Sequence, residues 1–237
     1  QKKTWTLKKL PDTGQKGDYT KTFGEDSDYE INPPSYTDNK NGTTTDNVTG
    51  LMWQTGEGGD MSYPAACVYC DTVRLGGYDD WRLPQNYELF SLVSLDRNKP
   101  AFDITAFSNS TSEYWWSINN AVGDTGRAWV VNAGGGTGAH PKSESISVGG
   151  TKHISEKCVR TMANAASSTI GDFTDNADGT VTDNKTGLMW QQKDTVGLTW
   201  EQALTYCENL VLAGHDDWRL PNAKELRSIS DDGLANP

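Results

Sequence analysis

Long apolar runs are absent from this sequence, and positively charged residues are few. No stretch reaches the roughly 20 consecutive apolar residues that a membrane-spanning helix needs, so we expect no membrane span. Lys and Arg number 21 against 32 Asp and Glu, which gives a net charge of -11. Because nucleic acids and anionic polysaccharides are recognised through positive charge, this balance argues against both as partners.

Histidine and cysteine, which supply many metal ligands and catalytic groups, are also scarce. The 3 His are scattered without the spacing of a metal site, and no Ser, Cys or carboxylate stands in a recognisable nucleophile or dyad context. We therefore expect no metal, no cofactor and no enzymatic activity. With Gln1 at its start and no hydrophobic leader before it, we expect the chain to be mature or trimmed. Its many Trp, Asn, Gly and Thr residues and few Lys residues predict an exported bacterial protein.

What the sequence does contain is an internal repeat with a fixed offset of 137 residues. The strings TGLMWQ and DDWRLP each occur twice at this offset. When residues 36–92 are aligned with residues 173–229, 28 of 57 positions are identical. We call these segments the first repeat and the second repeat. A period of 137 residues is too long for a solenoid or propeller unit, so each repeat is expected to belong to its own domain.

Both repeats predict the same order of elements. Turn residues at Asn41-Gly42 and at Asp178-Gly179 lie between Thr-rich runs and predict hairpins, and LMWQ supplies a third strand. A helix follows, with Thr199 and Gln202 as a capping box in the second repeat. In the first repeat, the apolar residues at helical spacing are Tyr63, Ala66, Cys67, Cys70 and Val73.

A second helix is expected after DDWRLP in each repeat. Asn222 and Glu225 have the pattern of an N-cap and its partner three residues later, whereas Gln85 takes the place of the cap in the first repeat. Only the first repeat continues, with strands expected in EYWWSINN, GRAWVVN and HISEKCVR and a Gly-rich loop over residues 133–150.

These elements predict four parts of the chain. The Lys-rich N-terminus is expected to be a solvated arm, although its basic charge would also suit an acidic partner. The predicted parts are an arm at 1–23, a complete domain at 24–162, a linker at 163–170 and the first half of a second domain at 171–237.

The four cysteines predict one disulfide. Cys70 is on the buried helix face and Cys158 is in the last strand of the same domain, so we expect these two to pair. Cys207 matches Cys70, and its own partner would fall beyond residue 237. We expect Cys207 to be a free thiol or to be bonded to another group. Within this sequence, Cys67 is the one other thiol that has no assigned partner. Cys67 and Cys70 form a C-x-x-C, but Leu204 replaces the first Cys in the second repeat, which favours packing over redox chemistry.

Six short sequence strings, taken in their order along the chain, resemble the motifs of a known bacterial family. T-D-N-x-T-G-L-M-W-Q, A-x-x-Y-C, G-G-Y-D-D-W-R-L-P, Y-W-W-S, A-W-V-V-N and C-V-R are similar to the Lcl C-terminal domain, found in collagen-like adhesins and other exported proteins. The resemblance covers residues 24–162 completely and residues 171–237 as a first half. It implies a C-type-lectin-like α+β fold with two helices flanking small antiparallel sheets, duplicated in tandem with the second copy incomplete.

The same resemblance bears on ligand chemistry. The Glu-Pro-Asn, Gln-Pro-Asp and Trp-Asn-Asp triplets of sugar-binding C-type lectins are absent, so we expect binding without calcium. The repeated Trp53, Trp81 and their counterparts are interpreted as structural. Arg82 and Arg219 are expected to pair with nearby carboxylates, namely Asp79, Asp80, Asp216 or Asp217.

The later strands of the first domain are the predicted ligand site. Trp115 and Trp116 are adjacent in a strand, so one ring must leave the core unless both faces are covered. Aromatic rings with amide and guanidinium donors suit a sugar or a peptide, but an ordinary strand pair with a flexible hairpin would show the same residues. The predicted site residues are Trp115, Trp116, Asn119, Arg127, Trp129, Asn132 and His140.

The sequence thus predicts an exported recognition or adhesion module, in the periplasm or at the cell surface, that binds a glycan, protein or peptide. A structural spacer in a larger surface protein is the first alternative. An enzyme on a fold like that of the formylglycine-generating enzymes is the second, although fold analogy alone supplies no activity. An oligomer that completes the second domain by strand exchange has no sequence signal of its own.

Overall fold

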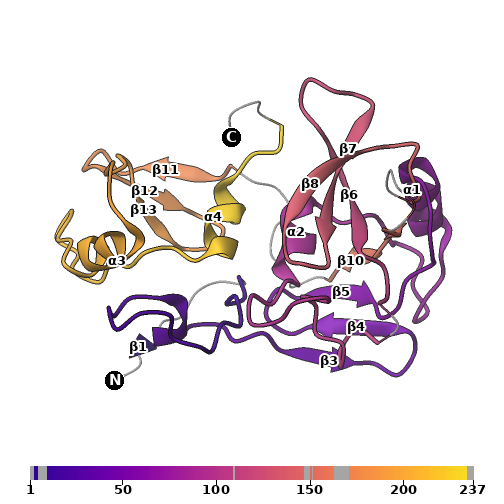
Figure 1. The fold of residues 1–237 in the computed structure, drawn as a ribbon, viewed down its shortest axis with the longest axis horizontal. Coiled ribbons are helices and arrows are strands. Elements are labelled where there is room, and N and C mark those ends of the chain that lie inside the picture. The colour runs from indigo at the N-terminus through magenta and orange to yellow at the C-terminus, as the bar shows by residue number, and fades with distance from the viewer. Residues whose placement is uncertain are drawn as a thin grey trace.

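A computed structural model describes residues 3–4, 10–108, 110–146, 150, 152–162 and 171–233. The linker predicted at 163–170 lies outside these residues. The chain is mixed α+β, as expected, and its sheets are mainly antiparallel (Figure 1).

The first sheet contains the hairpin strands of the first repeat and has the order β10-β5-β4-β3. Its strands are β3 (Tyr36–Asp38), β4 (Thr43–Asp46), β5 (Leu51–Gln54) and β10 (Val159–Thr161). Lys40 (φ 59°) and Gly42 (φ 83°) take the positive φ values that the β3–β4 turn requires. At the β4–β5 turn, the Asp46 carboxylate accepts hydrogen bonds from the N–H groups of Val48 and Thr49. The predicted meander is therefore confirmed.

The second sheet contains the later strands and has the order β8-β7-β6-β9. Its strands are β6 (Tyr114–Asn120), β7 (Arg127–Asn132), β8 (Thr137–Pro141) and β9 (Ile154–Ser155). The prediction of a loop over residues 133–150 is wrong for its first part, because β8 pairs with β7 there. Glycines at 134–136 make a tight turn, and the backbone beyond them is free to extend the ladder.

Two of the four helices in the described residues pack against the second sheet, and three of the four begin with a capping box. They are α1 (Tyr63–Thr72), α2 (Asn86–Ser91), α3 (Trp200–Glu208) and α4 (Ala223–Ile229). α1 contacts β6, and α2 contacts both β6 and β7. The capping boxes predicted at Thr199/Gln202 and Asn222/Glu225 are confirmed, and Gln85 forms one with Glu88 as well.

Two apolar clusters form the core of the first domain. One joins the first sheet, α2 and residues 101–107 and includes Trp53, Leu89 and Trp115. The other joins α1 to the second sheet and includes Trp116 and the predicted disulfide, which links Cys70 to Cys158 and is confirmed.

The second repeat reproduces the local structure of the first. Its sheet is β11 (Phe173–Asp175), β12 (Thr180–Asp183) and β13 (Met189–Gln191), in that order. The pairing of Val181 with Trp190 repeats that of Thr44 with Trp53. α4 packs against α2, so the second helices of the two repeats lie beside each other (Figure 1).

The N-terminal segment packs against both repeats. β1 (Lys3–Thr4) pairs in parallel with β2 (Tyr29–Glu30), which follows a short 3-10 helix, η1 (Asp26–Asp28). Thr13 is 1% exposed, and its carbonyl oxygen accepts a hydrogen bond from the N–H of Leu95. Pro11 and Thr13 are buried, so the solvated arm predicted at 1–23 is wrong for these two residues, whereas residues 16–19 are exposed. The segment lies along α3 and α4 (Figure 1).

Candidate functional site

The two adjacent tryptophans of the predicted site both lie in the core. Trp115 and Trp116 are each 0% exposed, because both faces of β6 are covered. The Trp115 indole N–H donates to the Glu57 carboxylate at 2.8 Å, and the Trp116 indole N–H donates to the Met61 carbonyl at 2.8 Å. Of the two alternatives, the structure shows the one in which both faces are covered, and residues of the segment after β5 accept hydrogen bonds from both indoles. Neither ring has a face open to a ligand.

Three polar residues of the predicted site hydrogen-bond to the backbone. The Asn119 side-chain oxygen accepts from the Asn86 N–H at 2.8 Å, at the start of α2. The Arg127 guanidinium donates to the Ala139 carbonyl at 2.6 Å. The Asn132 side-chain oxygen accepts from the N–H groups of Gly134 and Gly136 and so forms the β7–β8 turn. These contacts shape the strands.

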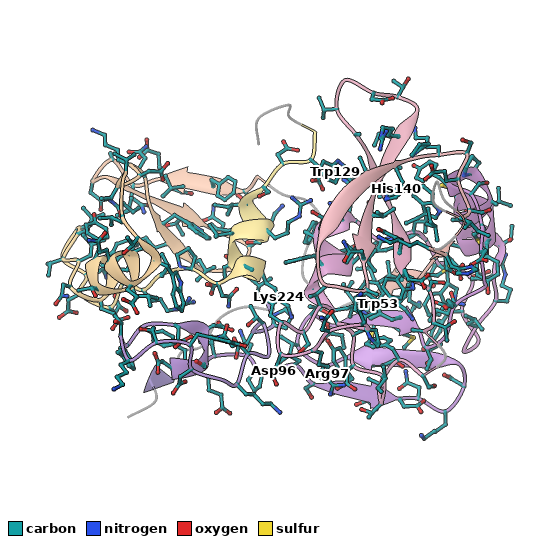
Figure 2. All side chains as sticks on the ribbon, in the orientation of Figure 1. Trp53, Asp96, Arg97, Trp129, His140 and Lys224 are labelled. Carbon is teal, nitrogen blue, oxygen red and sulfur yellow. A yellow bond between two sulfur atoms is a disulfide. The ribbon has the colours of Figure 1, made fainter. Side chains whose placement is uncertain are left out.

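Trp129 and His140 contact different parts of the molecule. The guanidinium carbon of Arg227, in α4, lies 5.9 Å from the Trp129 ring centroid, so this ring faces the second repeat (Figure 2). His140 Nδ1 lies 3.0 Å from the Glu144 carboxylate, and its ring is 4.7 Å from that of Tyr114. The structure therefore does not bring the seven predicted residues together in one pocket.

The expected partners of the repeated arginines also differ. Arg82 forms a two-pronged ion pair with Glu88, at 2.8 Å for each bond, and Arg219 pairs in the same way with Glu225. The predicted pairing with Asp79, Asp80, Asp216 or Asp217 is wrong, because each capping box turns its glutamate back toward the preceding strand. Asp80 pairs instead with Arg160. Trp53 and Trp81 are buried, as predicted, whereas Trp190 and Trp218 are half-buried.

A cavity of about 450 Å³ lies between the N-terminal segment and the chain after α2. This volume falls within the range of small-molecule sites. Asp96 and Arg97, which the chain after α2 contributes to the lining, are labelled in Figure 2. Its charged and aromatic lining residues are Asp12, Lys16, Asp26, Tyr29, Glu30, Tyr36, Asp96, Arg97 and Asp103. Five carboxylates face two cations, so the cavity is acidic.

Hydrogen bonds across the cavity fix its two walls. The Asp12 carboxylate accepts from the N–H groups of Ile31 and Asn32 at 3.0 and 2.9 Å, which folds the N-terminal segment into a loop. The Asp96 carboxylate accepts from the Lys16 N–H at 3.3 Å, across the opening. Backbone contacts thus set the spacing of the carboxylates.

The lining carboxylates differ in pKa. Burial raises the pKa of Asp12, and the nearby charges of Asp26 and Glu225 add to the rise despite two backbone hydrogen bonds. Burial also acts to raise the pKa of Asp103, but hydrogen bonds from Thr105 and the charge of Arg97 outweigh it and lower the pKa. Burial thus disfavours the charged form of Asp12, whereas the charged form of Asp103 is stabilised by its hydrogen bonds and by Arg97.

Lys224 joins the second repeat to this acidic region. Its side chain is almost wholly buried, and its ammonium donates to the Asp12 carbonyl at 2.8 Å (Figure 2). Burial lowers the pKa of Lys224 to about 8, although the carboxylates of Asp46, Asp26 and Asp12 oppose this shift. In the first repeat the same position is Tyr87, so this buried cation is specific to the second repeat.

Replacing Lys224 with methionine is expected to change how stability depends on pH. A folded-state pKa of about 8, below the ordinary 10.5, means that stability is lost as the pH falls from about 10.5 through 8. From pH 7.5 to pH 10, the wild type should therefore gain about 2 kcal/mol relative to Lys224→Met, measured by urea denaturation. The exposed Lys193→Met is the matched control and should run parallel to the wild type. A constant difference between wild type and Lys224→Met would contradict the shift.

Neither a metal cluster nor a membrane helix is found in the part of the chain that the structure describes. No group of three or more His, Cys, Asp or Glu in those ranges is placed to hold a metal ion. None of the helices described is long and apolar enough to cross a membrane.

Comparison of the sequence with models of known protein families identifies the family of this chain. The sequence model of the Lcl C-terminal domain matches residues 42–150 and 179–237, more than half of the chain. The chain belongs to the Lcl C-terminal domain family. The first Lcl C-terminal match runs from the β3–β4 turn past β8, and the second begins at the β11–β12 turn and includes α4. Searches of the curated proteins and of the solved structures gave no match.

The cavity carboxylates had no signal in the sequence. Asp12 and Asp96 are 84 positions apart and belong to no repeated motif. The repeated motifs consist of residues that build the Lcl C-terminal fold, and most of them are buried in the first repeat. The cavity arises where the N-terminal segment, which lies outside the family match, packs against that fold.

Proposed function

We propose that this protein is an exported recognition or adhesion module that binds a glycan or peptide, without calcium, in the acidic cavity. The single observation that carries the proposal is a cavity of about 450 Å³ in which five carboxylates face two cations beside Tyr29 and Tyr36. The Lcl C-terminal family and the disulfide support export, because disulfides persist in oxidising compartments.

The lining favours a ligand rich in hydrogen-bond donors. Carboxylates accept hydrogen bonds from hydroxyl and ammonium groups, and bonds to a charged acceptor are stronger than neutral ones. Sugar hydroxyls and the amino groups of peptides or amino sugars supply such donors. Asp96 is exposed at the rim of this cavity, so it can receive them directly.

The same lining favours binding over catalysis. The Asp12 carboxylate is occupied by two backbone N–H groups, and Asp103 accepts from Thr105 and pairs with Arg97. These bonds hold the carboxylates in place and leave them poorly suited to exchange protons with a substrate. Recognition is therefore the function that we propose, as the sequence also suggested.

A glycan and peptide array tests the proposal. Labelled protein should bind at least one ligand class equally with and without EDTA, and Asp96→Asn should bind about tenfold more weakly, the loss expected for one charge-assisted hydrogen bond. Asp217→Asn is the matched control, because it removes one exposed carboxylate outside the cavity lining. Equal binding by both variants would mean that the ligand binds outside this cavity. A blank array would favour the structural spacer.

A further inference from the structure

The β3–β4 turn contains an Asn-Gly pair that occurs once in the sequence, at Asn41-Gly42. In such a pair, the backbone nitrogen of the glycine can attack the side-chain carbonyl carbon of the asparagine and close a five-membered ring. Glycine permits this attack best, because it has no Cβ to block the approach. Asn41 and Gly42 are both exposed, so water can reach the pair and ammonia can leave it.

The turn polarises the side-chain carbonyl of Asn41. Its oxygen, Oδ1, accepts hydrogen bonds from the Thr43 N–H at 3.2 Å and from the Thr43 hydroxyl at 2.7 Å. When a nucleophile adds to a carbonyl carbon, negative charge develops on the oxygen, and donors already aimed at that oxygen stabilise the transition state. The two Thr43 donors therefore have the arrangement of an oxyanion hole.

A neighbouring asparagine fixes the direction of the Thr43 hydroxyl. Asn39 Nδ2 donates to Thr43 Oγ1 at 2.9 Å and to Thr45 Oγ1 at 3.0 Å. An amide NH₂ group can only donate, so the Thr43 oxygen accepts this bond and its own proton is left for Asn41. Thr43 is 0% exposed, which shields its hydroxyl from competing water. The donor to Asn41 is thus held in place before any reaction begins.

The nucleophile lies beside this carbonyl. The bond between the Thr43 N–H and Asn41 Oδ1 folds the side chain over the peptide bond to Gly42, so the carboxamide carbon faces the Gly42 nitrogen. Within the part of the chain that the structure describes, the Gly42 N–H donates no hydrogen bond, whereas its carbonyl accepts one from the Thr55 N–H at 3.0 Å. The nitrogen can therefore react without breaking a bond of the fold.

The second repeat carries aspartate at the position of Asn41. Asp178 Oδ1 accepts from the Thr180 N–H at 3.1 Å and from the Thr180 hydroxyl at 2.6 Å. Asn176 Nδ2 donates to Thr180 Oγ1 at 2.9 Å, as Asn39 does to Thr43. The same turn thus accommodates a carboxylate in place of the carboxamide with the same hydrogen bonds.

We propose that Asn41 is a site of self-modification, at which the folded turn promotes loss of the side-chain amide as ammonia. The Gly42 nitrogen gives its proton to solvent and bonds to Asn41 Cγ, the bond from Cγ to Nδ2 breaks, and ammonia leaves with a proton from solvent. Water then opens the resulting succinimide at either carbonyl, which leaves aspartate or isoaspartate at position 41. The net reaction consumes one water and releases one ammonia.

The two products have different effects on the turn. Aspartate adds one negative charge and keeps the backbone path that the second repeat shows at Asp178. Isoaspartate places one additional methylene group in the main chain, which disturbs the bond from the Asn39 N–H to the Thr43 carbonyl at 3.0 Å. Asn41 is outside the lining of the acidic cavity, so this proposal and the proposed ligand site can fail independently.

Prolonged incubation of the full-length chain at mildly alkaline pH, followed by peptide mass spectrometry, tests the proposal. Position 41 should gain the mass difference between an amide and an acid. The folded chain should react about tenfold faster than a free peptide with the sequence of residues 36–46, because the peptide does not hold the two donors in place. This comparison uses the unmutated sequence and does not depend on the folding of a variant.

Two variants separate the role of the Thr43 hydroxyl from that of the turn. Thr43→Val should slow the reaction about tenfold, because it removes one hydrogen bond to the developing negative charge. Thr45→Val is the matched control and should keep the rate of the wild type, since the Thr45 hydroxyl bonds to Asn39. Equal rates for the two variants would overturn the proposal. So would a faster reaction in the free peptide than in the folded chain, because the turn would then protect Asn41.

Discussion

Replacing Trp115 with alanine is expected to lower the free energy of unfolding by about 3–5 kcal/mol. The ring is fully buried, and its centroid lies 4.4 Å from that of Phe102 in a stacked arrangement. Its loss leaves a cavity in the main apolar cluster and removes one donor from the Glu57 carboxylate. Urea denaturation followed by circular dichroism measures the change.

Trp200→Ala provides the matched control for that experiment. Trp200 begins α3 and is 47% exposed, so its removal should cost no more than about 1 kcal/mol. A similar loss for both variants would contradict the assignment of Trp115 to the core. Since Trp115→Ala acts on folding, loss of ligand binding by this variant would not identify a binding residue. Asp96→Asn, at the surface, is the suitable probe.

Replacing both Cys70 and Cys158 with alanine is expected to lower the free energy of unfolding by about 4–5 kcal/mol. The bridge closes 88 residues, and in the chain-entropy model a loop of this length strongly restricts the unfolded chain. Both residues are 0% exposed, so reduction of the wild type should require partial unfolding. Denaturant unfolding of the double variant measures the effect.

The free cysteine Cys67 supplies the comparison for the disulfide. It is half-buried on the same helix, and Cys67→Ala should cost about 1 kcal/mol or less. If the double variant were as stable as Cys67→Ala, the bridge would contribute little, and packing of the second sheet on α1 would have to hold the domain together.

The elements that depend on neighbours in sequence were predicted correctly. Thr199 with Gln202 and Asn222 with Glu225 begin helices because each cap needs only four consecutive residues. The hairpin turn at Asn41-Gly42 likewise needs only its own residues. Cys70 could be paired with Cys158 because few cysteines were available.

The rest depends on contacts that no local pattern encodes. The tryptophans of β6 are both buried because Glu57 and Met61, more than 50 positions earlier, lie over the two sides of the strand. The N-terminal segment packs through Asp12 and Lys224, 212 positions apart. Alternation of polar and apolar residues shows which residues lie on each face of a strand, but it does not show whether one or both faces are covered by other parts of the chain.

The repeated hydrogen bonds also bear on the order in which the chain folds. Arg82 and Glu88 are separated by 6 positions, Gln54 and Tyr69 by 15, and the bond between Gln191 and Tyr206 repeats the latter spacing. Closing such short loops costs little conformational entropy, whereas docking β10 onto β5 must close a far longer one. On a ribosome, the hairpins and the first helix of each repeat can therefore form before the later strands have been synthesised.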